Sequence, residues 1–385
     1  MMRMLTAYTR EIDDIEISVA EVLKQLNLKD RMLRNSVGIL AFHPEFLETG
    51  AARAVSEALP FDSIGGTTSE AAVAGAMGDL VLTVAVLTSD DIVFRAGATD
   101  PIEGDDPREP IRELYARLAP SPAEKPALLF TLAPVISNIG GDGFIEALDA
   151  ASGGVPLFGS LAFTPLPDFN GIETCWNGKR GTNAFTLIAM FGEIKPDFFL
   201  TSIPDDRVIR QDAVITDAVK NRIRSINGIA PLEYLESIGL AETEGETVII
   251  SNPFVLTLGD GSRIVRAASK TTAEGHILAL GTIPQGAQIG FSVSDAKFVL
   301  QSTRDTMAQA VAASRAKNAL VFSCVARRWT LGASRDAEMK ELAGRLDGAL
   351  AYQFAYSGGE FCPVKNREGR LVNRFHNFSM IACLV

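Results

Sequence analysis

The sequence predicts a mixed α and β (α+β) fold made of repeated strand-helix-strand-turn-strand units, with mixed sheets covered by helices and a chain divided into two halves. Three observations support this prediction. Short apolar runs typical of buried strands recur, each is followed by a segment with helical spacing, and each helix leads to a second strand ending in small residues or glycine. A chain of 385 residues can also bury two or three hydrophobic cores.

The repeated unit occurs three times. Its first strands are expected at residues 37–42, 127–132 and 319–324. The helices that follow are expected at residues 44–59, 142–151 and 336–346. Pro44 suits the start of the first helix, because the first helical turn does not need the N–H group that proline lacks.

Each unit then ends in a turn and a further strand. The second strands run into small or glycine-rich segments at residues 64–70, 158–163 and 355–360. Another apolar strand is expected after each turn, at residues 80–87, 183–191 and 378–385.

The region between the second and third units has a different pattern. It begins with a charged, amphipathic stretch at residues 208–227, which fits either a helix packed on its own domain or a surface for protein interaction. After it we expect a helix at 231–238, strand-like runs at 247–250 and 277–280, and a helix at 295–313 capped by Ser294. A domain boundary near residue 225 therefore divides the chain into residues 1–224 and 225–385.

Composition excludes several classes of protein. With 47% apolar and 22% charged residues, the chain has the composition of a soluble globular protein. Its net charge of −11 disfavours binding to nucleic acid. Four cysteines without CxxC spacing indicate neither a disulfide framework nor a zinc site, and they favour a reducing cytoplasm. No run reaches the roughly 18 to 20 apolar residues that span a bilayer, so membrane insertion is not expected.

The segment near the C-terminus has the most informative pattern. Glycines, a carboxylate and a histidine lie in apolar surroundings within Tyr356-Ser357-Gly358-Gly359-Glu360-Phe361-Cys362-Pro363 and Phe375-His376-Asn377-Phe378-Ser379-Met380. Glycine lets the backbone approach a ligand closely, and a carboxylate and an imidazole have few purely structural reasons to lie beside buried phenylalanines. The segment therefore predicts a pocket wall, with candidate ligand contacts at Tyr356, Gly358, Gly359, Glu360, His376 and Asn377.

Charged residues suggest how such a pocket can hold a ligand. Glu360 and Glu70 each end a glycine-rich turn, where a carboxylate can receive the ammonium group of an amino acid while backbone N–H groups receive its carboxylate. Arg327 and Arg328 follow a buried strand and can pair with a ligand carboxylate or a haem propionate. Solvated turn residues and a plain salt bridge are the structural alternatives, and the sequence leaves them open.

Two histidines are candidate haem ligands. His376 shares a strand face with Phe378 and Met380, an apolar setting that suits an axial ligand to haem iron. His43 lies between a strand and a helix, where open α/β sheets tend to place ligand contacts. The alternatives are a hydrogen-bonded core histidine at position 376 and a helix-entry residue at position 43.

Several strings, in their order and spacing, carry a family resemblance. In the first half they are the strand-helix unit through Pro44, Gly65-Gly66-Thr67-Thr68-Ser69-Glu70 and Phe158-Gly159-Ser160. In the second half they are Asn227-Gly228-Ile229-Ala230-Pro231-Leu232-Glu233-Tyr234-Leu235, Phe322-Ser323-Cys324-Val325-Ala326-Arg327, Gly358-Gly359-Glu360-Phe361 and Phe375-His376-Asn377-Phe378-Ser379. With these strings the chain resembles the FIST sensory domain family, in both its N-terminal and C-terminal domains, over nearly the whole length.

The resemblance implies an intracellular, ligand-binding module of signal transduction, with amino acids as proposed ligands and no established catalysis. A chain of this length also resembles the nitric-oxide-sensing haem proteins of the NosP type, which act on a partner histidine kinase. We therefore expect a non-enzymatic, cytoplasmic sensory protein with no nucleic-acid partner. Its two ligand hypotheses are haem that senses nitric oxide and a free amino acid.

An enzyme is the least supported class of function. Ser357, Cys324 and Cys362 are conceivable nucleophiles for a hydrolase or transferase. None of them lies in a GxSxG elbow, and the sequence has no HExxH or P-loop motif. Without an identifiable base and orienting group, a catalytic triad has no support.

Overall fold

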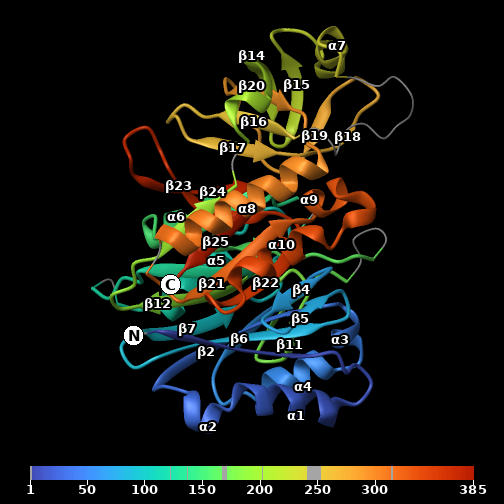
Figure 1. Ribbon diagram of the computed structural model, residues 1–385. Coiled ribbons are helices and arrows are strands. Elements are labelled where there is room, and N and C mark those ends of the chain that lie inside the picture. The colour runs from blue at the N-terminus through green and yellow to red at the C-terminus, as the bar shows by residue number, and fades with distance from the viewer. Residues whose placement is uncertain are drawn as a thin grey trace.

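The computed structural model describes residues 2–121, 123–136, 138–166, 171–201, 203–240, 253–313 and 315–385. Within them the chain forms three similar units, each with a mixed six-stranded sheet, and a seven-stranded sheet inserted into the third unit. Figure 1 shows the inserted sheet at one end of the molecule and the helices α1 (Ile15–Leu26) and α4 (Ala51–Glu57) at the opposite end. Among the described residues, no helix combines the length and hydropathy that crossing a membrane requires.

The first unit contains the expected strand-helix-strand order. Its elements are β1 (Arg3–Thr9), α1, α2 (Leu28–Arg31), β2 (Asn35–Phe42), α3 (Glu45–Glu48), α4, β3 (Ser63–Thr67), β4 (Ala71–Val73), β5 (Ala76–Gly78) and β6 (Leu82–Ser89). The prediction of one helix at 44–59 was wrong, because Gly50 takes a φ of 85° and separates α3 from α4.

The second unit repeats this order. Its elements are β7 (Val93–Ala98), α5 (Arg108–Leu118), β8 (Leu128–Ala133), α6 (Gly141–Ser152), β9 (Leu157–Leu161), β10 (Thr174–Trp176), β11 (Lys179–Gly181) and β12 (Thr186–Phe191). A strand before the repeated unit and a hairpin within it, here β7 and β10–β11, were not expected from the sequence.

The third unit is split by the inserted sheet. Its elements are β13 (Asp197–Leu200), α8 (Ala296–Ala313), β21 (Asn318–Cys324), α9 (Val325–Thr330), the 3-10 turn η3 (Gly332–Ser334), α10 (Ala337–Leu346), β22 (Ala351–Ser357), β23 (Glu360–Lys365), β24 (Leu371–His376) and β25 (Met380–Leu384). Asp295 caps α8 in place of the expected Ser294, because its carboxylate accepts the N–H of Phe298 at 2.7 Å.

The inserted sheet is antiparallel throughout and has the order β17-β16-β20-β14-β15-β19-β18. Its elements are the 3-10 turn η2 (Asp205–Arg207), β14 (Val208–Val219), β15 (Arg222–Ile226), α7 (Pro231–Ser237), β16 (Phe254–Thr257), β17 (Arg263–Arg266), β18 (Ala268–Thr271), β19 (Ile277–Ala279) and β20 (Gln288–Ser292).

Three expectations from the sequence fall in or beside the inserted sheet. The stretch at 208–227 is the β14–β15 hairpin and not a helix, because Ala213 and Ile215 alternate with more exposed residues and bury one face of a strand. The boundary expected near residue 225 falls within β15. The strand-like run expected at 247–250 lies outside the described residues.

Each unit gives a hairpin to the sheet of another unit. β4 of the first unit pairs with β22 of the third, β10 of the second pairs with β3 of the first, and β23 of the third pairs with β9 of the second. Within each unit the two strands that flank the crossover helix pair in parallel. The exchange is cyclic, so each six-stranded sheet is completed by residues from a different unit.

The inner faces of the three sheets meet in one central core. Ile64 of the first unit, Phe130 and Phe158 of the second and Phe322 of the third are all buried in it. The three phenylalanine rings have centroids 5.9 to 6.5 Å apart. Helices α1 and α4 cover the outer face of the first sheet, α5 and α6 the second, and α8 and α10 the third.

The central core gives a first prediction. Phe158→Ala removes a ring that is 0% exposed, and we expect it to lower the free energy of unfolding by about 3–5 kcal/mol. Gly344→Ala is the control, because Gly344 lies in α10 and an added Cβ there meets no atom within 4 Å. That control should raise the free energy of unfolding by about 1 kcal/mol. Urea unfolding measures both, and equal effects of the two variants would contradict the central position of Phe158.

Candidate functional site

The parallel strand pairs of the three units end at equivalent positions. The last pairs in register are Phe42 with Thr67, Ala133 with Leu161 and Cys324 with Ser357. From there the chain crosses into the exchanged hairpin, and a buried glutamate stands where each hairpin begins. These residues are Glu70, Glu173 and Glu360, which are 2%, 8% and 0% exposed.

Two of the three glutamates have an arginine partner. Glu70 forms an ion pair with Arg328 of α9. Glu173 accepts a hydrogen bond from Nε of Arg180 at 2.8 Å. A buried carboxylate needs such a partner, because its charge is costly away from water.

Glu360 is the exception. Its carboxylate oxygens accept hydrogen bonds from Ser357 Oγ at 2.5 Å and Ser379 Oγ at 2.6 Å, and within the described ranges it forms no ion pair. Burial raises the pKa of Glu360 to about 8, although both serines and the charge of Arg327 act in the opposite direction. At neutral pH the side chain is therefore mostly protonated, and one serine hydroxyl then accepts a hydrogen bond from the carboxyl O–H group.

Strain and unpaired polar groups surround Glu360. Its cross-strand partner is His376, which is 0% exposed, has Nε2 3.2 Å from the carbonyl oxygen of Cys362, and has a pKa lowered by burial to about 3. Neither side-chain polar atom of the buried Asn377 has a hydrogen-bond partner among the described residues, and the same holds for Nδ1 of His376. Phe378 has a φ of 54°, a conformation that non-glycine residues seldom adopt. Such features gather at functional sites, because structural cores avoid their cost.

The remaining arginine candidate belongs to a second buried cluster. Arg327 forms an ion pair with Glu338 at 2.7 Å, and the exposed fractions of the two side chains are 1% and 0%. Its other donors bind Thr303 Oγ1 and the carbonyl oxygen of Val299. The hydroxyl of Tyr356 lies 3.3 Å from the carboxylate of Glu338. Arg327 thus forms the salt bridge that was one of its two interpretations, and its donors face protein groups.

Ser323 joins the two clusters. Its hydroxyl donates to Glu338 at 3.0 Å, and its carbonyl oxygen accepts from Ser357 Oγ at 3.2 Å. The ring of Tyr356 also faces Arg328, with 6.0 Å between the guanidinium carbon and the ring centroid. The structure therefore brings together Glu70, Arg327, Tyr356, Gly358, Gly359, Glu360, His376 and Asn377 at the exchanged hairpins of the first and third units.

His43 has a different setting. It lies after β2 in the first unit, is 7% exposed, and its Nδ1 accepts the N–H of Glu45 at 3.4 Å. Burial lowers the pKa of its imidazole. This contact matches the interpretation of His43 as a helix-entry residue bonded to local backbone.

A cleft of about 550 Å³ lies between the second unit and the inserted sheet, and of the site residues expected from the sequence Gly358 is the one in its lining. One wall is the start of α6 with the loop before it, and the other is the β14–β15 turn and the loop after β19. Its floor includes Leu161 at the end of β9 and Gly358 just after β22. Gly359 follows with a φ of 149°, and a Cβ there would lie 2.3 Å from the ring of Phe375. The carboxyl ends of parallel strands are where α/β sheets commonly bind ligands.

A buried arginine connects the two walls of the cleft through an ion pair and a hydrogen bond. Arg266 of the inserted sheet is 0% exposed, pairs with Asp142 of α6 at 2.7 Å and donates to the carbonyl oxygen of Phe375 at 2.6 Å. Asp142 in turn accepts the N–H of Thr282 at 2.8 Å. Gly281 is required here, because a Cβ at that position would lie 2.7 Å from Nε of Arg266. The inserted sheet, α6 and the strand that carries His376 therefore meet at one point.

The cleft offers groups of both charges. Asp105, Glu146 and Lys220 line it, and Lys220 and Asp105 form an exposed ion pair at 3.4 Å. Neutral polar groups come from Asn138, Asn221, Ser269 and Thr282. Gly141, the first residue of α6, also lies in this wall, and the start of a helix favours an anion. The arrangement suits a small ligand that carries both an anionic and a cationic group.

Haem does not fit these residues. A haem iron needs an axial ligand such as histidine, and no residue that lines the cleft is a histidine. His376 is fully buried with Nε2 engaged by the Cys362 carbonyl, and His43 lies in the first unit. The cleft therefore supplies no imidazole to an iron.

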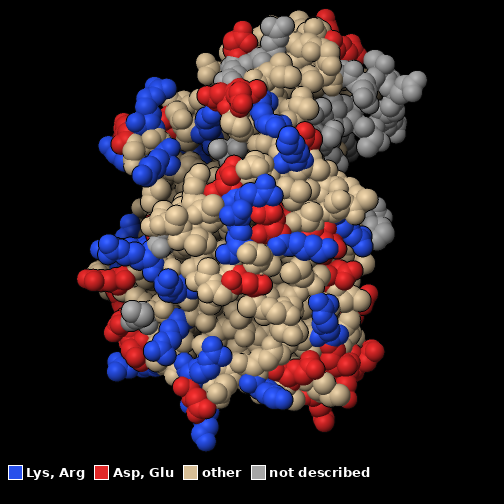
Figure 2. Space-filling view, in the orientation of Figure 1, with Lys and Arg blue, Asp and Glu red and all other residues tan. Residues whose placement is uncertain are grey.

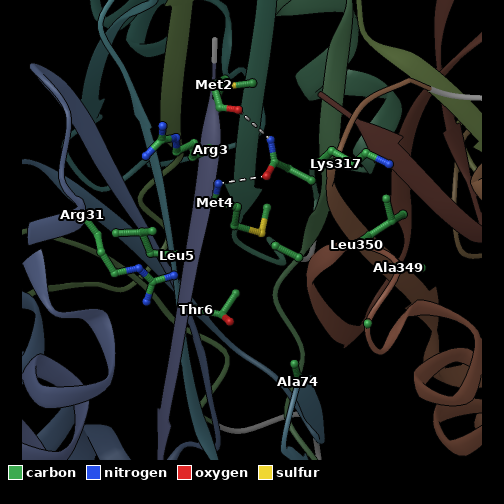
Figure 3. Close-up of a pocket in the computed structure, with 13 residues that line it drawn as sticks. Met2, Arg3, Met4, Leu5, Thr6, Arg31, Ala74, Lys317, Ala349 and Leu350 are labelled. Carbon is green, nitrogen blue, oxygen red and sulfur yellow. Dashed lines mark hydrogen bonds between the residues drawn. The ribbon is translucent and has the colours of Figure 1, made fainter.

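A second hollow, of about 570 Å³, lies along the edge of β1 (Figure 3). Asn318 satisfies this edge, because its side chain accepts the N–H of Met4 at 2.9 Å and donates to the carbonyl oxygen of Met2 at 3.2 Å. Figure 3 shows Arg3 and Arg31 on one side of β1 and Lys317 on the other, so these charges do not converge. The hollow also lies at the starts of β21 and β22, away from the glutamates.

Sequence reasoning missed several residues that shape the site. Glu173 is equivalent to Glu70 and Glu360, but a longer loop separates it from its strand and hides the equivalence. Asp142 and Arg266 carried a weak signal, since each is a charged residue beside an apolar stretch. Ser379 was visible only as a neighbour of His376. Asp142 and Arg266 become partners only through the fold, because 124 residues separate them in the chain.

The titration of Glu360 gives a second prediction. Its folded pKa of about 8 exceeds the unfolded value of about 4.3, so folding binds a proton. The stability that this contributes is complete below the unfolded pKa and is lost as pH rises toward the folded pKa. Relative to Glu360→Gln, the wild type should lose up to about 1.4 kcal/mol of unfolding free energy per pH unit from about pH 5 to about pH 8. Parallel pH profiles of the two proteins in urea unfolding would refute the raised pKa.

The ion pair of Arg327 gives a third prediction. Arg327→Met leaves Glu338 buried without a cation, so we expect a loss of about 3–5 kcal/mol in unfolding free energy. The double variant Arg327→Met/Glu338→Leu should recover part of that loss. Arg53→Met, which breaks an exposed pair with Glu57, is the control and should change little. Thermal and urea unfolding measure all three, and a small effect of Arg327→Met would argue against a structural role.

Comparison with known proteins agrees with this architecture. The FIST N domain matches residues 36–229, and the FIST C domain matches residues 231–363. No curated protein matches the chain significantly. FIST domains are sensory domains of signalling proteins. The chain belongs to the FIST family.

Proposed function

We propose that this protein senses a small zwitterionic ligand, such as a free amino acid, in the cleft between the second unit and the inserted sheet. The observation that carries the proposal is the cleft of about 550 Å³ at the ends of β9 and β22, which offers opposite charges from two separate walls. Its size falls within the range of small-molecule sites. Its place at the strand ends and the sensory role of FIST domains support the same proposal.

The ligand groups can be assigned to the two walls. The start of α6 at Gly141 suits the ligand carboxylate, and Lys220 adds a positive charge from the inserted sheet. Glu146 and Asp105 suit the ammonium group, which would replace Lys220 as the partner of Asp105 while Lys220 binds the ligand carboxylate. Asp142 is not available to the ligand, because Arg266 and the Thr282 N–H already engage its two oxygens.

Binding across both walls supplies a signal. A ligand that contacts α6 and the inserted sheet together favours a closed cleft, because only that arrangement lets it make both sets of contacts. Arg266 would carry the change inward, since it joins the inserted sheet to the carbonyl of Phe375 beside His376. A signalling protein, for which a histidine kinase is one candidate, would then read the closed form.

Two other functions have less support. A haem-based nitric oxide sensor needs an accessible axial ligand, and neither His43 nor His376 lines the cleft. A hydrolase or transferase needs a nucleophile that meets its substrate. Ser357 is 0% exposed and its hydroxyl bonds to Glu360.

A ligand screen tests the proposal. We expect at least one of the common amino acids to raise the melting temperature, since saturation at about 100 Kd adds about 2.7 kcal/mol of stability. Glu146→Gln and Lys220→Gln should each weaken that ligand by about tenfold or more in calorimetric titration, because each removes a charged hydrogen-bonding partner. Lys24→Gln changes an exposed charge on α1 and is the matched control.

Two results would count against the proposal. One is the absence of any amino acid that binds, and the other is an equal affinity in all three variants. Reconstitution with haem tests the haem-sensor alternative. A stoichiometric Soret band that collapses in His43→Ala or His376→Ala would establish a haem protein instead.

A further inference from the structure

The hairpin that the third unit gives to the second is longer than its two equivalents. Hairpin β4–β5 covers residues 71–78 and β10–β11 covers residues 174–181, whereas β23–β24 covers residues 360–376. Only Glu360 and Phe361 of this hairpin pair with β9. Residues 363–374, which we call the arm, therefore extend beyond what the sheet of the second unit needs.

The arm is basic in an acidic protein. Four cationic side chains, Lys365, Arg367, Arg370 and Arg374, stand in it against one carboxylate, Glu368, while the whole chain has a net charge of −11. Figure 1 shows the hairpin projecting from the body beside the inserted sheet, and Figure 2 shows Lys and Arg atoms gathered there. Within the described residues Lys365 and Arg367 form no ion pair. Arg370 pairs only with the exposed Glu368, at 3.0 Å.

The tip of the arm is held in one conformation. The side-chain oxygen of Asn366 accepts the N–H groups of Glu368 and Arg370, each at 3.0 Å. Gly369 supplies the positive φ of 77° that the turn requires. The cationic side chains are thus presented from an ordered turn, which lowers the entropy that docking would cost.

The arm also contacts the sheet that forms one wall of the cleft. The N–H of Arg367 donates to the carbonyl oxygen of Asp260 at 2.9 Å, and Arg374 pairs with the carboxylate of Asp260 at 2.5 Å. These contacts use the backbone of Arg367 and the side chain of Arg374. They leave the side chains of Lys365 and Arg370 exposed, so support of the inserted sheet does not account for those two charges.

We propose that the arm is the docking surface for an acidic partner protein, which reads the state of the ligand cleft. This inference rests on the proposed function for the existence of a signalling partner. The strands of the arm carry Glu360 and His376 at their base, and its middle contacts the inserted sheet. A movement of that sheet on ligand binding would therefore change how the arm is presented.

A protein fits the arm better than a nucleic acid does. The basic area is limited to one hairpin of a chain with net charge −11, which would repel a long polyanion. Leu371 is 46% exposed beside the cations and adds an apolar contact. Arginines around an apolar residue are typical of the contacts that dominate protein interfaces.

Charge reversal tests the inference. The probe is a fluorescein-labelled peptide of twelve residues in which Glu and Leu alternate, and fluorescence anisotropy at low salt measures its binding without any cleft ligand. We expect Lys365→Glu/Arg370→Glu to weaken binding by about tenfold or more, because unlike charges become like charges. Lys24→Glu/Lys29→Glu makes the same change in net charge at exposed residues near α1 and should retain the wild-type affinity. The milder Lys365→Gln/Arg370→Gln should give an intermediate loss, and circular dichroism checks that every variant is folded.

Three results would overturn the inference. They are no binding of the peptide to the wild type, an equal loss in the arm and control variants, and tighter binding of a twelve-nucleotide oligothymidylate than of the peptide. A separate calorimetric titration measures whether amino acids bind the cleft of the wild type and of the arm variant. If the arm binds the peptide but no amino acid binds the cleft, the proposed function fails and the docking inference stands. The failure of one proposal can therefore be told from the failure of the other.

Discussion

The cyclic exchange of hairpins is the constraint on which the rest of the structure depends. Each six-stranded sheet gains the two strands at one end from another unit, so no sheet is complete within its own unit. The exchange also fixes where the polar chemistry lies. Every crossing from a parallel strand into a donated hairpin carries a glutamate into a buried position, and three such crossings place three carboxylates at the strand ends. Each unit therefore has to neutralise a buried carboxylate.

The three units neutralise their buried glutamates in different ways. Arg328 and Arg180 neutralise the first two carboxylates, whereas a proton neutralises Glu360. Among the described residues, buried polar atoms without a partner occur at the third crossing in His376 and Asn377, beside the positive φ of Phe378, and at the first crossing in Ser69, Glu70 and Arg328. Only the third unit holds an inserted sheet, which closes over the second unit and forms the cleft. A repeated scaffold therefore supplies stability, and the departures from its repetition supply the candidate site.

The sequence predicted the parts of this structure that depend on local pattern. The strand-helix-strand units were found because each strand is a continuous apolar run buried on both faces. Glu360, His376 and Asn377 could be singled out as candidates because polar residues in an apolar segment are visible in the sequence alone. The hairpin exchange could not be predicted, because strands of three residues such as β4 and β10 have almost no pattern and pair with distant segments. The cleft could not be predicted for the same reason, because residues that line it, such as Gly358 and Lys220, come from separate parts of the chain.

One measurement tests the ligand cleft most directly. All four native cysteines are buried, and burial raises the pKa of each thiol, so a cysteine introduced at Ser269 in the cleft wall can be labelled selectively with a maleimide. Ala349→Cys, in the hollow beside β1, is the matched control. A mixture of free amino acids should slow labelling at position 269 and leave position 349 unchanged. Labelling at position 269 that is unaffected, or slowed equally at both positions, would contradict a ligand site in the cleft.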